Sequence, residues 1–282
     1  MSQNRIVIEA GKENKTYWKD IWTFRSLFYF LAWRDILVRY KQTTIGLAWA
    51  LIRPFLMIAV FGSVNMILMG QDKNPHGVPV FILIAAAILP WNFFSTAFSE
   101  CSSSLVANSN LVSKVYFPRL IVPASTVIVC LIDFFISFVI IIGLMIYYQF
   151  FPGWQILWLP VFLLMALVTA LGTGIYFSAL NVKFRDFRYI IPFMVQFGLY
   201  ISPIMFTSQF IYDHKSIPQF VKYIYSMNPM VSVIDGFRWC LNGDAIQFHW
   251  VEFSISVCIS LFFLVIGIIT FRKMEKGFAD VI

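Results

Sequence analysis

Residues 120–147 have the sequence LIVPASTVIVCLIDFFISFVIIIGLMIY, an apolar run interrupted by a single acidic residue, Asp133. About 20 apolar residues in a helix are enough to cross the hydrocarbon core of a bilayer. Five further stretches have the same character, so the sequence predicts six spans at about residues 46–70, 78–103, 120–147, 157–181, 189–206 and 251–271. The expected fold class is therefore an all-α integral membrane protein with six transmembrane helices.

The composition agrees with this fold class. The chain is 60% hydrophobic and only 12% charged, and its mean hydropathy is +0.78, which a soluble domain of this length could not accommodate on its surface. The polar residues 1–16 do not resemble a cleavable signal. No internal repeat or low-complexity linker divides the sequence, so we expect a single membrane domain over residues 1–282.

The basic residues indicate the orientation. With alternate loops on opposite sides of the membrane, seventeen of the 21 lysines and arginines fall on the side that carries both termini. Basic residues are retained in the cytoplasm during insertion, so we expect both termini to be cytoplasmic. This orientation, with an attraction to anionic membrane lipids, accounts for the net charge of +7. A nucleic-acid partner is therefore not expected.

The segment 17–41 precedes the first predicted span and is rich in aromatic residues. On a helix, one face would carry Trp18, Ile21, Phe24, Phe28 and Leu31, and the opposite face Lys19, Thr23 and Ser26. This pattern indicates an amphipathic helix lying in the membrane interface. A seventh span is the alternative, but the charged residues of the segment leave too short an apolar run.

Residues 207–249, between the last two predicted spans, are too apolar and aromatic for a solvated loop. We expect them to form two short re-entrant helices that dip back into the outer leaflet, with a break at Asn228-Pro229. Irregular backbone is tolerated at that depth where it packs against protein or lines a cavity.

The sequence contains no motif for catalysis, metal binding or ATP hydrolysis. The GxxxxGK[ST], HExxH and GxSxG patterns are absent, and the three histidines and four cysteines lack metal-ligand spacing. We therefore expect no catalytic residue, no metal and no cofactor on this chain. If transport uses ATP, the ATPase must be another polypeptide.

Asp133 and the segment 108–119 each allow two interpretations. Asp133 is the only acidic residue deep within a predicted span; it is either a protonated carboxyl bonded to a neighbouring helix or a transport residue. Arg53 lies about 10 Å into the first span, too shallow for pairing with Asp133 to be expected. The segment 108–119 predicts a short cytoplasmic helix, which either docks on its own bundle or presents a surface to a soluble partner.

Several motifs resemble those of a known family. They are RDILVRYKQTTIGLAWALIRP at 34–54, KVYFPR at 114–119, FRDFR at 184–188, Ser202-Pro203-Ile204, Asn228-Pro229 and DGFR at 235–238. In this order the chain resembles the type-2 ABC transporter permeases of the polysaccharide exporter group, which includes O-antigen, capsule and teichoic acid exporters.

The resemblance implies an assembly and a location. Two copies of this permease, a homodimer, would bind two ABC ATPase subunits that carry ATP and Mg, in the cell inner (plasma) membrane. The substrate would be a lipid-linked glycan, and its path would follow the dimer interface, formed mainly by the first and fifth spans.

The resemblance also assigns residues to three sites. The glycan's pyrophosphate headgroup would enter near Arg34, Arg39, Lys41, Gly46 and Arg53. Coupling to the ATPase would use the segment that contains Asn108, Leu111, Lys114, Tyr116, Phe117 and Arg119. An external gate would include Asn228, Pro229, Asp235 and Arg238.

Two other functions compete with polysaccharide export. One is ABC-type export of a small molecule or drug. The other is an ion-coupled secondary carrier, which would need more charged residues at mid-depth than Asp133 alone.

Overall fold

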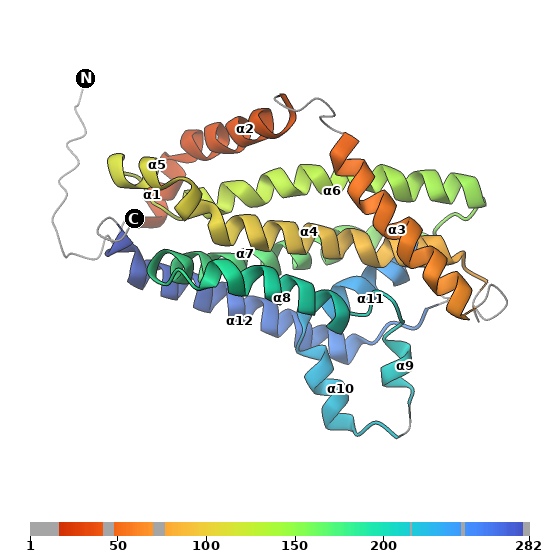
Figure 1. Ribbon diagram of the computed structural model, residues 1–282. Coiled ribbons are helices and arrows are strands. Elements are labelled where there is room, and N and C mark those ends of the chain that lie inside the picture. The colour runs from red at the N-terminus through yellow and green to blue at the C-terminus, as the bar shows by residue number, and fades with distance from the viewer. Residues whose placement is uncertain (1–16, 42–47, 70–76, 215, 244–245, 279–282) are drawn as a thin grey trace.

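The computed structural model describes residues 17–41, 48–69, 77–214, 216–243 and 246–278, and all regular secondary structure in these ranges is helical (Figure 1). Five helices have the length and apolar composition needed to cross a membrane. They are α3 (Ala48–Met69), α4 (Val80–Ala107), α6 (Ile121–Tyr148), α7 (Leu159–Lys183) and α12 (Trp250–Glu275). These helices confirm five of the six predicted spans and the all-helical membrane fold.

The remaining predicted span, 189–206, is a shorter helix in the structure. Helix α8 (Phe187–Ile201) has 15 residues, or about 22 Å of helical rise, against about 30 Å for the hydrocarbon core. It ends because Ser202 precedes Pro203 and takes an extended conformation with ψ 149°, as residues before proline prefer. The exact six-span pattern is therefore not established.

Helix α4 is the centre of the bundle. It packs against α6 on one side and α7 on another, and α12 covers α7 (Figure 1). Ala85, Ala86 and Ala87 are all fully buried, so α4 is enclosed on every side at this level. Small side chains allow this because neighbouring backbones can approach closely in a membrane bundle.

The α7–α12 contact shows this closeness most directly. A Cβ atom on Gly267 would lie 2.4 Å from the carbonyl oxygen of Gly172, and one on Gly172 would lie 2.5 Å from the backbone nitrogen of Leu264, so both positions favour glycine. Nearby, the hydroxyl oxygens of Thr169 and Ser260 are 2.9 Å apart. Close packing and an interhelical hydrogen bond therefore hold these two helices together.

The predicted interfacial segment forms two consecutive helices, α1 (Tyr17–Thr23) and α2 (Arg25–Lys41). Ile21, Phe24, Phe28 and Leu31, which the sequence predicts to share one face, pack on the bundle. Trp18 does not, because it is 57% exposed. The outward face also carries exposed aromatic side chains: Trp22, Tyr29, Phe30 and Trp33.

Residues 207–249 contain α9 (Gln209–Tyr212), α10 (Gln219–Ser226) and α11 (Pro229–Asn242). The predicted break at Asn228-Pro229 is confirmed. The side-chain oxygen of Asn228 accepts a hydrogen bond from the Met230 amide at 3.1 Å, which caps α11, and proline suits the first helical turn. Helix α11 is buried against α4, α7 and α12, whereas α9 and α10 project from the bundle (Figure 1).

Candidate functional site

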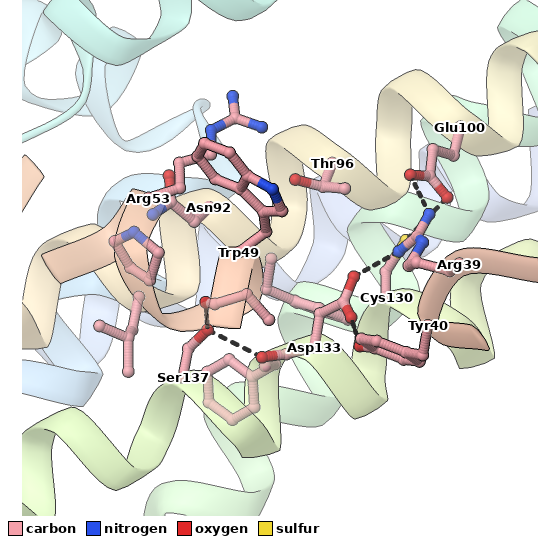
Figure 2. A pocket seen from close by; sticks show the side chains of 15 residues that line it. Arg39, Tyr40, Trp49, Arg53, Asn92, Thr96, Glu100, Cys130, Asp133 and Ser137 are labelled. Carbon is pink, nitrogen blue, oxygen red and sulfur yellow. Dashed lines mark hydrogen bonds and ion pairs between the residues drawn. The ribbon is translucent and has the colours of Figure 1, made fainter. Parts of the chain in front are cut away.

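A cavity of about 390 Å³ opens where the end of α2 and the start of α3 meet α4 and α6 (Figure 2). Its charged lining residues are Arg39, Arg53, Glu100 and Asp133. Aromatic and uncharged polar residues complete the part labelled in Figure 2: Tyr40, Trp49, Asn92, Thr96, Cys130 and Ser137.

The sequence does not indicate the partners of Asp133, which are on α2. Its carboxylate pairs with the guanidinium of Arg39 and accepts a hydrogen bond from the hydroxyl of Tyr40. Both residues belong to α2, which packs along α6. Asp133 lies about 18 Å along α6 from the start of that helix, and the packing of α2 brings Arg39 beside it. Asp133 is therefore bonded to a neighbouring helix, α2, through Arg39 and Tyr40.

Arg39 also pairs with Glu100 of α4, so one guanidinium joins three helices. Burial acts to lower the pKa of Arg39. The nearby carboxylates of Glu100 and Asp133 have the larger combined effect, so the pKa of Arg39 is raised above its usual value. Arg39 therefore stays charged, and its single positive charge is shared between two carboxylates.

Arg53 occupies a different position in the same cavity. It lies in the second turn of α3, and its side chain is exposed. The ion pairs formed among the described residues do not include Arg53. The first turn of α3 is fixed to α6 because the hydroxyl of Ser137 donates to the carbonyl of Ala50 at 2.9 Å. Arg53 is thus a cation on an anchored helix and lines the cavity.

The face of α4 that lines the cavity carries Asn92, Thr96 and Glu100 at intervals of four residues. The side-chain nitrogen of Asn92 is buried and has no hydrogen-bond partner among the described residues. An unmade hydrogen bond at a buried donor costs about 1–3 kcal/mol, so this nitrogen is a ready donor for a ligand that carries oxygen acceptors.

The predicted site residues do not include Asn92, Thr96 or Glu100. A signal was present, because polar residues four apart in an apolar helix lie on one face. That spacing could have identified the polar face of α4, although not the helices α2 and α3 that lie opposite it.

The structure brings together only two of the five predicted headgroup residues. Arg34 lies outside the cavity, where its guanidinium contacts Asp35 at 2.7 Å and the side-chain oxygen of Asn108 at 2.9 Å. Lys41 is exposed at the end of α2. Gly46 lies outside the described residues.

The segment 108–119 contains α5 (Ser109–Lys114) and divides into an inner and an outer side. Leu111 and Phe117 pack on the hydrophobic core, whereas Lys114 and Tyr116 are exposed. One side of the segment therefore docks on the bundle, and the other side is exposed.

Both ends of that segment are attached to neighbouring helices. Asn108 accepts the hydrogen bond from Arg34 of α2. The backbone amide of Arg119 donates to Glu275, in the last turn of α12, at 2.9 Å. We call the region of α5 and Glu275 the α5 end of the bundle.

Of the predicted gate residues, Asn228 caps α11, Pro229 is its first residue, and Asp235 and Arg238 lie within it. Arg238 is 1% exposed and donates to the carbonyl oxygens of Ile204 and Phe206, each at 3.0 Å. Asp235 has its pKa raised to about 6 by burial, although Arg238 and a hydrogen bond with Ser208 act in the opposite direction.

Nothing in the described residues suggests metal chemistry. Within these ranges, no three His, Cys, Asp or Glu side chains are grouped to hold a metal ion, and the four cysteines are free thiols. The cavity can instead bind an anionic or hydroxyl-rich ligand.

A helical membrane bundle with a charged cavity agrees with the membrane subunit of a transporter. The comparison with known families agrees: residues 26–242 match the family described as "ABC-2 type transporter". The chain belongs to this family, whose members are non-catalytic permease subunits.

Individual relatives match over most of their length. The chain is 24% identical to the O-antigen export system permease protein RfbA of Klebsiella pneumoniae, over 88% of this chain and 92% of the relative. It is 26% identical to RfbA of Myxococcus xanthus, over 78% and 82%. It is 23% identical to the polysialic acid transport protein KpsM of Escherichia coli, over 86% and 92%.

Proposed function

We propose that this chain is the permease of an ATP-driven exporter that moves a lipid-linked polysaccharide out of the cytoplasm across the inner membrane. The observation that carries the proposal is the similarity, over nearly the whole chain, to permeases of O-antigen and polysialic acid export. The cavity is lined by two arginines, two carboxylates and uncharged hydrogen-bond donors, and arginine and these donors can meet the oxygens of a phosphate-linked sugar.

The proposed topology has six spans, with α8 as the fifth, and both termini in the cytoplasm. The distribution of lysine and arginine supports this orientation. Helix α8 has 15 residues, so a complete crossing at this span would also use the apolar residues 202–206 that follow it. The α5 end of the bundle then faces the cytoplasm, and α9, α10 and α11 form a re-entrant region on the outer side.

The proposed partner is an ABC ATPase, in two copies, bound to the α5 end. The exposed side chains of Lys114, Val115 and Tyr116 support this, because a charged residue beside two apolar ones makes a compact docking surface. The attachments at Asn108 and Arg119 would pass movement of this surface to α2 and α12.

The proposed assembly is a homodimer with the translocation path between the two permeases. Helices α3 and α8 leave many large apolar side chains uncovered, including Phe55 and Leu56 on α3 and Phe193, Phe197 and Tyr200 on α8. Aromatic faces on α8 would suit sugar rings, whose apolar sides stack on aromatic planes.

The headgroup would enter at the cavity, where Arg39 and Arg53 are present, with Arg34 and Lys41 on its approach along α2. Arginine is suited to phosphate because its planar fork makes two hydrogen bonds at once. The outer gate would be α11 with Asn228, Pro229, Asp235 and Arg238, since this helix is held against the segment that follows α8.

Deletion of the gene tests the proposal in the cell. The expected result is loss of a surface glycan together with accumulation of the lipid-linked polymer inside the inner membrane. Re-expression of the chain should restore export only when its ATPase is present. An unchanged surface glycan in the deletion strain would argue against polysaccharide export.

A further inference from the structure

We propose that the two cavity arginines have different roles: Arg53 meets the anionic headgroup, whereas Arg39 is a positioning residue that Glu100 and Asp133 hold away from it. This inference rests on the proposed function, because it assumes that the headgroup of the lipid-linked substrate enters the cavity. It adds Glu100 and Asp133 to the residues that shape this site.

The charge of the cavity lining is balanced. Arg39 and Arg53 contribute two positive charges, and Glu100 and Asp133 contribute two negative ones. A phosphate entering this space gains no net attraction from the four groups together. Their arrangement therefore decides where an anion can bind.

The arrangement separates the two cations. The two terminal nitrogens of Arg39 are directed at different carboxylates, one at Asp133 on α6 and the other at Glu100 on α4. A phosphate would have to displace a carboxylate from a charge-assisted hydrogen bond to reach these donors. Displacement would also leave a carboxylate uncompensated in a partly buried place, which is costly.

The fixed position of Arg39 has a consequence for the cavity wall. Together with Tyr40, which binds Asp133, it ties the last turns of α2 to α4 and α6. Asp133 and Glu100 therefore determine where α2 ends and how wide the cavity opens beside α3. This is the role of a positioning residue.

Arg53 meets the requirements of a ligand residue. It lies on the same cavity as the unpartnered nitrogen of Asn92 and the hydroxyl of Thr96, and it takes no part in the ion pairs of the described residues. One guanidinium, one amide and one hydroxyl can donate to several oxygens of one phosphate group without breaking an existing ion pair.

Pairs of charge-matched variants test this division. The probe is farnesyl pyrophosphate, and the measurement is its dissociation constant for the assembled permease–ATPase complex in lipid nanodiscs. Arg39→Gln and Arg53→Gln each make the cavity more negative by one charge. Adding Asp133→Asn to either variant restores the balance, so the two double variants carry the wild-type net charge.

We expect both single variants to bind the probe about tenfold or more weakly, because one uncompensated charge acts at a few ångström in a medium of intermediate dielectric. Arg39→Gln/Asp133→Asn should return to within about threefold of the wild type. Arg53→Gln/Asp133→Asn should remain about tenfold weak, because the lost group is a ligand. Arg25→Gln removes an exposed charge from the first turn of α2 and should bind the probe as the wild type does.

Two outcomes would overturn the inference: Arg39→Gln/Asp133→Asn staying as weak as Arg39→Gln, or Arg53→Gln/Asp133→Asn binding like the wild type. A wild-type complex that does not bind the probe would overturn the headgroup site itself, and this inference with it. Gel filtration of each variant shows whether it is folded. If Arg39→Gln does not assemble, the comparison of the two double variants still decides.

Discussion

The guanidinium of Arg238 lies 3.0 Å from the carbonyl oxygen of Ile204. A second nitrogen of the same group donates to Phe206 at 3.0 Å. These carbonyls belong to the non-helical segment after α8, where Pro203 prevents the helix from continuing. One buried side chain therefore satisfies backbone groups that have lost their helical partners.

Replacing Arg238 should destabilise the protein strongly. Arg238→Lys keeps the charge but replaces the two terminal guanidinium nitrogens with one ammonium group. At least one of the two carbonyls is then left without its partner, which lowers the free energy of unfolding by about 1–3 kcal/mol. We expect a clearly lower Tm in detergent, measured by thermal unfolding. Arg188→Lys, at an exposed arginine in the first turn of α8, is the control. An unchanged Tm in Arg238→Lys would contradict the role of the fork.

Asp235 should make stability depend on pH. Burial raises its pKa from 3.8 to about 6 in the folded state, although Arg238, Ser208 and His249 act against this. The folded protein therefore binds the proton more tightly than the unfolded chain, so stability is greatest below about pH 4 for this group and decreases up to about pH 6. The difference amounts to about 3 kcal/mol.

The measurement is Tm between pH 4.5 and 7 in the wild type, in Asp235→Asn and in Asp213→Asn. Asp213 is exposed and serves as the control. We expect Asp235→Asn to remove part of the decrease in Tm with rising pH, and Asp213→Asn to leave it. A wild-type Tm that rises across this range, with Asp235→Asn following the same curve, would refute the assignment.

The contact between α7 and α12 should not tolerate a side chain at Gly267. In Gly267→Ala the new Cβ would meet the Gly172 carbonyl oxygen at 2.4 Å, and the two backbones must separate, which costs about 1–3 kcal/mol. We expect lower expression and a lower Tm. Gly143→Ala is the matched control, because no atom lies within 4 Å of its added Cβ, and alanine favours a helix over glycine. If both variants unfold alike, close packing is not the reason for Gly267.

The exposed side of the segment 108–119 should decide assembly with the ATPase. Tyr116 is 56% exposed, and truncating a central interface tyrosine commonly costs 1–2 kcal/mol or more. We expect Tyr116→Ala to weaken copurification of the ATPase about tenfold, with the permease itself unchanged in Tm. Tyr147→Ala is the control, since Tyr147 is 78% exposed in the last turn of α6, far along the helix from α5. Equal recovery of the ATPase with both variants would count against this surface.

The sequence predicted much of the architecture because hydropathy, proline and charge act locally. Five spans agree with apolar runs, and the break at Asn228-Pro229 follows from a capping side chain before proline. The span predicted to reach residue 206 was too long. The sequence stays apolar through Ile204, Met205 and Phe206, but the helix ends before Pro203. A single proline can end a helix within a segment whose mean hydropathy is high.

The helical fold, its spans and the charge bias were determined by the sequence alone, because each depends on residues near one another in the chain. The pairing of Arg39 with Asp133 and Glu100 was decided only by the tertiary structure. Neither the charges nor their spacing indicates that α2 runs beside α6, far enough along it to reach Asp133. That placement comes from the packing of Phe24, Phe28 and Leu31 on the bundle, and it converts an isolated acid in a span into part of an ion-pair cluster.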